Sequence, residues 1–375
     1  MKALVATPYY YPKVGGLENY ARQLNRVLIS QEGWSITVVT SSPRRRASRE
    51  IVDGHPVYRL GTWFKISNTP FNPLWRLQLR AVIAREQPDI IIAHAPVPSF
   101  ADAAVRAKGK TPFILVYHAA TLLKAGSPLF NLAARVYGLI GNTTLRRSDK
   151  IFAVSPYVRQ QFSTHLQRKT VVVPNAVAAH DIRRRSQPVQ PEFIFIASLD
   201  RTHSWKGLEQ VLEAVAYYRD HYSDDVRLTV IGDGTMRAEY EWAAASLGLG
   251  PHVGFLGALD GPRKIRVLRR ALGMIIYPRT ENDAFPTVML EAWANYVPVI
   301  GARIGAVATL IHDGQDGLLC EPLRPVALAA TMRRLVAMSP EARAQLAQCA
   351  ASRTRRHYTW ERQAHLVNQE AQKLV

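Results

Sequence analysis

The chain has 375 residues, 47% of them hydrophobic, which is enough for about two domains with substantial cores. No apolar run approaches the roughly 20 residues that a membrane-spanning helix needs, and the first strand-like residues are interrupted too soon for a signal peptide. The two cysteines, Cys320 and Cys349, exclude a disulfide framework and a zinc cluster and fit a reducing cytosol. We expect both to be ordinary buried thiols.

The net charge of +19 comes almost entirely from the first half of the chain. Residues 1–187 hold 27 Lys and Arg against nine Asp and Glu, whereas the remainder holds 21 against 20. A basic surface attracts phosphate groups, either of nucleic acid or of an anionic lipid leaflet. A solvated surface from an arginine-rich genome is the plainer alternative, but it does not predict the asymmetry. Since zinc-finger spacing, RNP-type aromatics and a basic region before heptads are missing from the sequence, nucleic acid is not an expected partner.

Strand-like and helix-like segments alternate through the first half. A helix is predicted at 17–28, after the Gly15-Gly16 turn, and strands are predicted at 3–6, 34–40, 88–94, 112–118, 150–154 and 170–173. Such alternation favours parallel strands joined by crossover helices. Two of the strands end at a histidine, His94 and His118. His94 could face a ligand cleft, although a structural role is the commoner one for such a histidine.

The charged, proline-containing segment 181–191 interrupts this rhythm and is predicted to be an interdomain linker. The alternation then resumes, with strands at 192–197, 226–231, 252–256, 273–277 and 297–301 and helices at 208–218, 235–247, 264–271, 287–295 and 358–375. We therefore expect an α/β protein with two doubly wound, Rossmann-like domains, 1–185 and 191–357, that face each other across a central cleft. Open parallel sheets bind ligands beyond the carboxyl ends of their strands.

The strongest local feature is the segment Tyr277–Glu291, in which a strand ends, an acidic loop follows and a helix begins near Thr287. A helix start has unpaired N–H groups and a partial positive charge. The amides of Thr287 and Val288 could therefore hold a diphosphate. Glu291, one turn further along, could accept hydrogen bonds from paired ribose hydroxyls. The alternative is an ordinary capped helix with acidic residues near its start.

An acidic residue, seven intervening residues and Glu291 in a Phe-Pro-x-Val-x-Leu-Glu-Ala setting resemble the hallmark of the family 4 glycosyltransferases. Other motifs follow in the family's order: Tyr11-Pro12-x-x-Gly15-Gly16-x-Glu18, His118, Val173-Pro174-Asn175, Trp205-Lys206-Gly207, Gly232-Asp233-Gly234, Val253–Gly257, Gly314-x-x-Gly317 and Trp360-Glu361. Each motif is weak alone, but the ordered set spans essentially the whole chain. The resemblance implies the GT-B fold, with the helix 358–375 returning to the N-terminal domain. It also implies a retaining mechanism and no metal or other cofactor.

The resemblance further implies roles for individual residues. Gly15 and Gly16 would let the backbone approach the donor phosphates, Lys206 would neutralise the diphosphate, and His118 would contact the transferred sugar. The other implied donor contacts are Phe255 and Gly257 at the base, Glu281 and Asp283 at the sugar hydroxyls, Phe285, Pro286, Thr287 and Val288 at the phosphates, and Glu291 at the ribose.

Two positions depart from the family pattern. The first acidic position is usually Glu but is Asp283 here, so Glu281 remains a second candidate for the sugar contact. The family often has Gly-Arg before the Lys-Gly, where this chain has Ala197-Ser198. We expect Arg201 to replace that arginine. The expected catalytic set is His118, Asp283, Arg201 and Lys206.

In the implied reaction, the bond between the anomeric carbon and a phosphate oxygen breaks, and negative charge grows on the leaving diphosphate. Lys206, Arg201 and the helix start at Thr287 are expected to stabilise that charge. A metal ion would do the same, but the sequence has no Asp-x-Asp motif to hold one.

The acceptor is expected to bind the basic first domain. The stretch 129–140 combines an apolar face with Arg135 and the nearby Arg146 and Arg147, which is typical of a helix at an anionic membrane surface. A core helix is the alternative. We expect a hexosyltransferase that uses a UDP- or GDP-linked sugar and a lipid-linked or cell-surface polysaccharide acceptor. It would be cytoplasmic and peripheral to the inner face of the membrane. Other possible functions are a sugar-nucleotide epimerase or phosphorylase on the same architecture, and a binding protein without activity.

Overall fold

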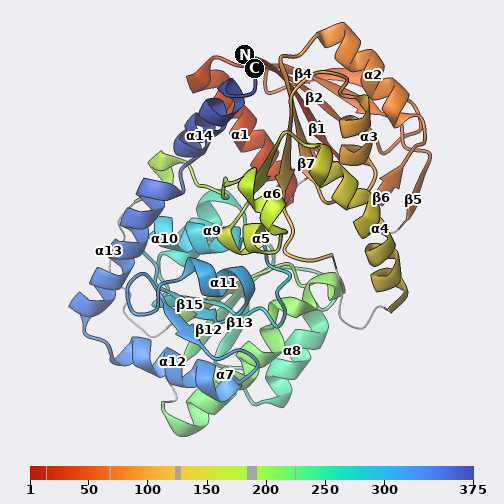
Figure 1. Ribbon diagram of the computed structural model, residues 1–375. Coiled ribbons are helices and arrows are strands. Elements are labelled where there is room, and N and C mark those ends of the chain that lie inside the picture. Colours follow the sequence, from red (N-terminus) through yellow and green to blue (C-terminus); the bar gives the residue numbers. More distant parts are fainter. Residues whose placement is uncertain (14, 67–68, 123–127, 184–191, 224) are drawn as a thin grey trace. The chain divides into compact units, whose positions relative to one another are not determined.

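The computed structural model describes residues 1–375 except 14, 67–68, 123–127, 184–191 and 224 (Figure 1). The chain divides into two compact units. Unit 1 comprises Met1–Asn175 and Trp360–Val375, and unit 2 comprises Ala176–Thr359. Both units are α/β, which confirms the predicted fold class. The first unit ends at Asn175 and not at residue 185.

An eight-stranded sheet forms the centre of unit 1. Its strands lie in the order β10 (Thr170–Val172), β9 (Lys150–Ala153), β8 (Phe113–Tyr117), β7 (Ile90–Ala95), β1 (Lys2–Thr7), β2 (Ser35–Ser41), β4 (His55–Leu60) and β3 (Ser48–Val52). All neighbours are parallel except β3, which runs antiparallel to β4 at the edge. The central strands are almost continuously apolar because helices cover both faces of a parallel sheet.

The helices of unit 1 are α1 (Gly16–Glu32), α2 (Trp75–Glu86), α3 (Phe100–Ala107), α4 (Pro128–Arg147), α5 (Pro156–Gln160), α6 (Thr164–Arg168) and α14 (Trp360–Gln372). The C-terminal helix α14 packs along α1, as the resemblance implied (Figure 1). The indole N–H of Trp34 donates to Asn368 on α14 at 2.9 Å. A small hairpin, β5 (Phe64–Ile66) and β6 (Thr69–Phe71), was not predicted, nor was the antiparallel strand β3.

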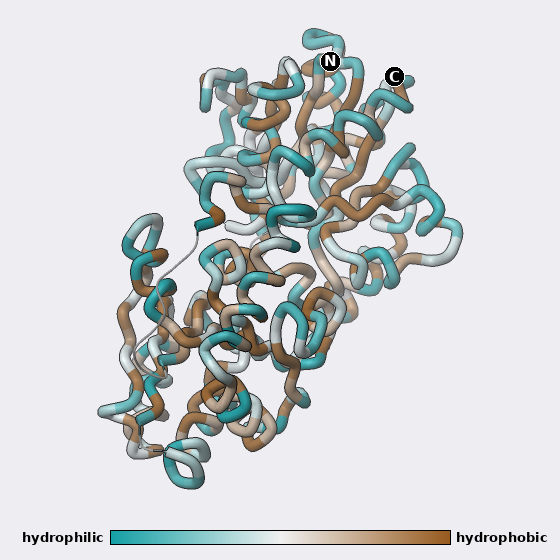
Figure 2. Tube along the Cα trace, turned by 90° about the vertical axis from the view of Figure 1, so that its left-hand side faces the viewer, coloured by the Kyte–Doolittle hydropathy of each residue, from teal (hydrophilic) through white to brown (hydrophobic). Residues whose placement is uncertain are grey.

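Unit 2 contains a six-stranded parallel sheet. Its strands lie in the order β13 (Val253–Phe255), β12 (Arg227–Ile231), β11 (Glu192–Ile196), β14 (Gly273–Ile276), β15 (Val299–Ala302) and β16 (Leu318–Cys320). The accompanying helices are η1 (Ala179–Asp181), η2 (Arg201–Lys206), α7 (Leu208–His221), α8 (Arg237–Ser246), α9 (Gly261–Leu268), α10 (Thr287–Ala294), α11 (Gly305–Leu310), α12 (Pro325–Ala337) and α13 (Pro340–His357). Hydrophobic and hydrophilic segments alternate along the chain (Figure 2), and in each unit the strands of the sheet centre are buried and apolar.

The strand orders identify where each sheet binds ligands. In unit 2, successive strands are added on one side of β11 and then, from β14 on, on its other side. In unit 1, the same reversal of strand order occurs between β1 and β7. Ligands of doubly wound sheets bind beyond the carboxyl ends of the strands at such a switch point. The loops that follow β11 and β14 carry Arg201, Lys206 and Asp283, and the loop after β1 carries Gly15.

Two expectations outside the site need correction. Ile182 is buried with Ala294 and Ala351, and the Arg183 N–H donates to the Ala294 carbonyl at 2.9 Å. Residues 181–183 therefore pack on unit 2 and are no free linker, while 184–191 lie outside the described residues. Cys320 is buried as expected, but Cys349 is exposed because it lies on the outer face of α13.

Candidate functional site

At the switch point of unit 2, a glycine allows the loops after β11 and β14 to contact each other. Gly207, at the end of η2, has a φ of 81°, and a Cβ there would lie 2.1 Å from the carbonyl oxygen of Tyr277. Only glycine tolerates both that conformation and that approach. The Arg279 N–H also donates to the Trp205 carbonyl at 2.7 Å. The loops after β11 and β14 are thus held against each other.

This closure brings together two predicted catalytic residues, Lys206 and Asp283. The Lys206 ammonium lies 2.5 Å from Asp283 Oδ2, although 77 positions separate the two residues. Asp283 is 8% exposed, and a carboxylate so far from water needs a cation beside it. The Lys206 Nζ also lies 4.4 Å from the centroid of the Trp205 ring, which favours a cation at this place.

The helix α10 begins beside this pair in sequence, at Thr287. Its N-cap residue is Pro286, and no side chain caps the helix start. The start of α10 therefore lacks a side-chain cap, and its binding of a phosphate stays a prediction. The first amides of a helix have no intrahelical partner and suit an anion. Phe285 is buried, with its ring centroid 5.8 Å from that of Tyr358, so its side chain anchors the loop in the unit 2 core.

Glu291 has a partner that sequence reasoning missed. Lys264 on α9 places its ammonium 2.8 Å from both oxygens of Glu291. The basic character of this helix was visible in the sequence, but nothing local connects position 264 with 291. The carboxylate oxygens of Glu291 can also accept hydrogen bonds from a ligand.

The structure separates the residues that sequence reasoning left as alternatives. Asp283 is buried beside Lys206, whereas Glu281 is exposed. The guanidinium of Arg201 is 73% exposed and pairs with Glu239 on α8 at 2.7 Å. Arg201 and Lys206 lie at opposite ends of η2, and here they have different partners.

The turn Phe255–Gly257 is braced by another residue that was not predicted. The guanidinium of Arg237 donates to the Phe255 carbonyl at 3.3 Å and pairs with Glu241 at 2.8 Å. Asp233 accepts a hydrogen bond from the Gly234 N–H at 2.8 Å, so it caps its own turn.

In unit 1, the two strand-ending histidines contact each other. His94 Nδ1 lies 2.9 Å from His118 Nε2, and their rings stack with centroids 5.2 Å apart. His94 is buried, and Tyr20 packs edge-on against His118 at 4.8 Å. The Tyr20 hydroxyl donates to the Val173 carbonyl at 3.0 Å, and its ring rests on Trp360 of α14.

The histidine pair is neutral. Burial lowers the pKa of His94 to about 3. Burial, and then the neighbouring His94, lower the pKa of His118 well below its usual 6.5. One ring nitrogen of the pair must donate and the other accept, so the proton on each ring is fixed by its neighbour. His118 can therefore offer a hydrogen bond but no positive charge at neutral pH.

The start of α1 shows why position 15 is a glycine. A Cβ on Gly15 would lie 2.4 Å from Glu18 Oε2, because this buried carboxylate folds back over the loop. At Gly16 a Cβ would meet nothing within 4 Å. Two contacts stay predictions: the approach of the donor phosphates to this loop, and the contact of the transferred sugar with His118.

The described part of the chain contains no group of three or more His, Cys, Asp or Glu side chains that could hold a metal ion. None of its helices combines the length and the apolar character that crossing a membrane requires.

Two family models match the chain in succession. Glycosyltransferase Family 4 matches residues 14–180, and Glycosyl transferases group 1 matches residues 180–353. The chain is 26% identical to the O-antigen chain mannosyltransferase C of Escherichia coli, over 89% of this chain and 88% of that protein. It is also 26% identical to the D-rhamnosyltransferase WbpZ of Pseudomonas aeruginosa, over 94% and 90%. A phosphatidyl-myo-inositol mannosyltransferase of Mycobacterium leprae is 23% identical, over 88% and 86%.

Solved structures show the same fold. Sucrose-phosphate synthase from Thermosynechococcus elongatus superposes with a TM-score of 0.79 at 18% identity, over 100% of this chain and 98% of that one. Anabaena Alr3699/HepE, solved in complex with UDP, gives 0.75 at 18% identity, over the whole of both chains. The fold is GT-B. These matches are to transferases, which sets aside the epimerase, the phosphorylase and the inactive binding protein. The chain is an enzyme and belongs to the group 1, family 4 glycosyltransferases.

Proposed function

We propose that the protein is a retaining hexosyltransferase that takes its sugar from a UDP- or GDP-linked donor and passes it to a lipid-linked or polysaccharide acceptor. The observation that carries the donor part is the Lys206–Asp283 pair at the switch point of unit 2. The names of two relatives mention the O-antigen chain and phosphatidyl-myo-inositol, and HepE was solved with UDP. Those names support a nucleotide sugar and a membrane-linked acceptor for this chain.

Binding of the donor would replace the Lys206–Asp283 ion pair with an ion pair between Lys206 and the diphosphate. An entering diphosphate carries more negative charge than one carboxylate, so it competes with Asp283 for Lys206. Asp283, released from the lysine, can then accept a hydrogen bond from a sugar hydroxyl. Because Asp283 is buried beside the cation and Glu281 is exposed, we assign this contact to Asp283. Glu291, with Lys264, would accept from the ribose.

In the proposed step, the bond between C1 of the sugar and the β-phosphate oxygen breaks while an acceptor hydroxyl oxygen bonds to C1 on the same face. The hydroxyl proton passes to the leaving phosphate oxygen. Lys206 and the amides of α10 would stabilise the charge that grows on the phosphate. Since these groups supply the positive charge, we propose that the reaction needs no metal ion. His118 would orient the sugar as a neutral hydrogen-bonding group.

The helix α4 supports a membrane-linked acceptor. Its side chains Leu132, Val136 and Leu139 are 61%, 58% and 73% exposed, and Ile140 is 42% exposed. The core-helix alternative is therefore wrong for these residues, while the side chains of Leu129 and Phe130 are outside the described set. The exposed Arg135 lies among them, and the exposed Arg146 and Arg147 end the helix. An apolar face beside arginines fits an anionic lipid surface, and we propose that the enzyme binds the inner face of the membrane.

A donor panel tests the first part. UDP- and GDP-linked hexoses, with the free diphosphates for comparison, are added while the melting temperature is followed. A true donor raises the melting temperature by mass action, and the base that it carries identifies the nucleotide. If no UDP or GDP compound raised the melting temperature at millimolar concentration, the proposed donor class would be wrong.

Liposome sedimentation tests the membrane part. We expect binding to vesicles that contain anionic lipid, and weaker binding as salt screens the arginines. Leu139→Glu should reduce binding strongly. Trp242→Glu is the matched control, since Trp242 is equally exposed at 73% but lies in unit 2. Absence of binding at low salt would remove the membrane proposal.

A further inference from the structure

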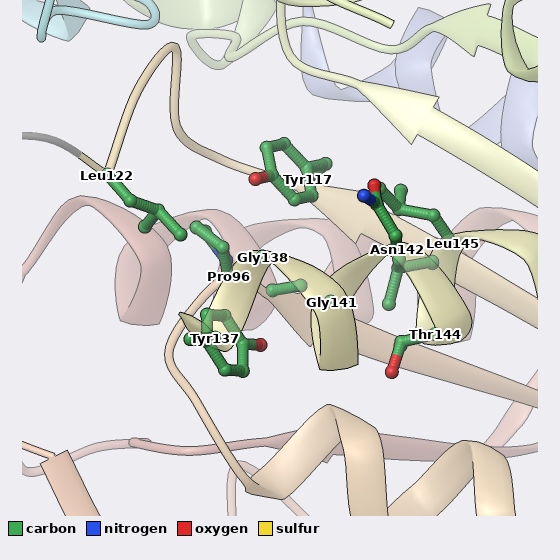
Figure 3. A pocket seen from close by; sticks show the side chains of 11 residues that line it. Pro96, Tyr117, Leu122, Tyr137, Gly138, Gly141, Asn142, Thr144 and Leu145 are labelled. Atoms are coloured by element: carbon green, nitrogen blue, oxygen red, sulfur yellow. The ribbon is translucent and has the colours of Figure 1, made fainter. Parts of the chain in front are cut away.

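The inner side of α4 borders a cavity of about 70 Å³ in unit 1. The ends of β7 and β8 form one wall with Pro96 and Tyr117, and Leu122 closes one side (Figure 3). The helix forms the opposite wall with Gly138 and Gly141 (Figure 3). We call this cavity the α4 crevice. Most of its lining is carbon, so it suits an apolar group.

The α4 crevice lies at the carboxyl ends of β7 and β8, on the face of the sheet opposite to the histidine pair. Ala95 and Tyr117 lie opposite each other on neighbouring strands and both line the crevice. His94 directly precedes Ala95 and His118 directly follows Tyr117, and successive side chains of a strand point to opposite faces. The two histidines therefore contact Tyr20 of α1 and do not line the crevice. The polar head of a molecule seated in the crevice would reach the site assigned to the transferred sugar past the ends of the two strands.

Two glycines keep the crevice open. A Cβ on Gly138 would meet nothing within 4 Å, and a Cβ on Gly141 would only reach the Tyr137 ring, at 3.6 Å. Packing within the described residues therefore does not require glycine at either position. Glycine inside a helix is destabilising relative to alanine. Two of them, one turn apart on the wall of a cavity, are explained if the space serves a ligand.

The wall beside these glycines is held in place. The Tyr137 hydroxyl donates to Asp102 Oδ2 at 3.1 Å, and Thr144 donates to the other oxygen of Asp102. Asp102 in turn accepts from the Ser99 N–H at 2.8 Å at the start of α3. The buried Asp102 thus fixes α4 on α3 and preserves the width of the crevice.

We propose that the α4 crevice binds the first apolar segment of a lipid phosphate acceptor, with the polar head at the carboxyl ends of β7 and β8. The same helix turns its exposed leucines and Val136 outward, so a chain leaving the crevice would continue along an apolar surface. Arg135 and Arg146 on this helix match the negative charge of the lipid phosphate. This inference rests on the proposed function, because it takes the acceptor to be lipid-linked.

Binding of farnesyl phosphate below its critical micelle concentration, measured by calorimetry, tests the inference. The wild-type protein should bind it saturably and should bind inorganic phosphate far more weakly. Gly138→Leu fills the crevice and should lower the affinity for farnesyl phosphate by about tenfold or more, because several methylene groups of the ligand lose their contacts. Gly138→Ala adds only the Cβ for which there is room and should bind within about twofold of wild type.

Leu122→Asp offers a second variant outside the helix, in case Gly138→Leu fails to fold. It places a charge at the side of the crevice and should also lower the affinity for farnesyl phosphate. Unchanged affinity in both variants, or no binding by the wild-type protein, would overturn the inference. The donor-induced rise in melting temperature should persist in all three variants, since none of them changes a residue assigned to the donor and Lys206, Asp283 and Glu291 lie in unit 2. Its absence from the wild-type protein would instead contradict the proposed donor chemistry.

Discussion

The histidine pair of unit 1 and the ion pairs of unit 2 are both polar clusters at a sheet switch point, but they handle charge in opposite ways. In unit 2, Lys206 and Lys264 are partly buried, and each forms an ion pair with a carboxylate. In unit 1, His94 and His118 lie against each other, and burial keeps both rings neutral at neutral pH. The first arrangement suits an anion and the second suits hydroxyl groups.

The two clusters also differ in what a ligand can change. An ion pair offers a cation that a stronger anion can take over, so the donor site can rearrange as its ligand enters. The histidine pair has no charge to exchange, and the ring of Tyr20, which itself packs on Trp360, contacts both histidines. We therefore expect unit 2 substitutions to affect charge stabilisation, and unit 1 substitutions to affect the orientation of the sugar.

The largest effect is expected from Lys206→Ala. The leaving diphosphate would lose its nearest cation, and turnover should fall by about 10²- to 10³-fold, as for the loss of one strong transition-state contact. Steady-state kinetics with the donor identified by the panel measures this. If Lys206→Ala kept the turnover of the wild-type enzyme, Lys206 would not be the residue that stabilises the leaving diphosphate.

Arg201→Ala sharpens that test. Arg201 is exposed and paired with Glu239. A loss as large as that of Lys206→Ala would show that Arg201 leaves Glu239 to hold the diphosphate, as sequence reasoning expected. A much smaller loss would leave Lys206 and the amides of α10 as the phosphate site.

A smaller, more selective effect is expected from His94→Phe. The aromatic ring fills the space but leaves His118 without its hydrogen-bonding partner, and an unpaired buried polar group costs about 1–3 kcal/mol. We expect kcat to fall by roughly 10- to 100-fold, with the donor-induced rise in melting temperature unchanged. His94→Asn, which can still donate and accept, should recover much of the loss. If the Asn and Phe variants were equally slow, the hydrogen bond would not be what positions His118.

Local signals in the sequence were sufficient for the elements that carry the site. Apolar runs closed by His94, His118 and the Tyr277-Pro278 pair identify three strand ends, because a buried parallel strand needs an unbroken apolar stretch. The start of α10 at Thr287 was predicted correctly. The edge strand β3 was missed because its five residues are mostly exposed, two of them are charged, and they show no alternation of apolar and polar residues.

The pairings inside the site could not be predicted in the same way. Lys206 meets Asp283 only because β11 lies beside β14, and the sequence does not state that order. Lys264 meets Glu291 for a similar reason, across 27 positions. The contact of His94 with His118 depends on the register of β7 and β8, so the commoner structural role was favoured for His94. Contacts between distant residues depend on topology, which local periodicity does not encode.

The smallest effect is expected in the acid stability of unit 1. Between the unfolded pKa near 6.5 and the folded value of about 3, the unfolded chain binds a proton at His94 that the folded chain does not. The contribution of His94 to the free energy of unfolding is therefore fully present above about pH 6.5. Below that pH the free energy of unfolding falls by about 1.4 kcal/mol per pH unit for one such group. His118, whose pKa is also lowered, adds to the same trend.

Hydrogen exchange of the β7 and β8 amides between pH 4.5 and 7.5 measures this locally, which matters because two units can unfold separately. After correction for intrinsic exchange, opening should become easier as the pH falls, and His94→Asn should make that dependence shallower. His180→Asn is the control, since this histidine is exposed and lies in unit 2. Equal pH dependence in wild type and His94→Asn would mean that His94 takes up its proton in the folded state. The neutral histidine pair would then not distinguish unit 1 from the charged site of unit 2.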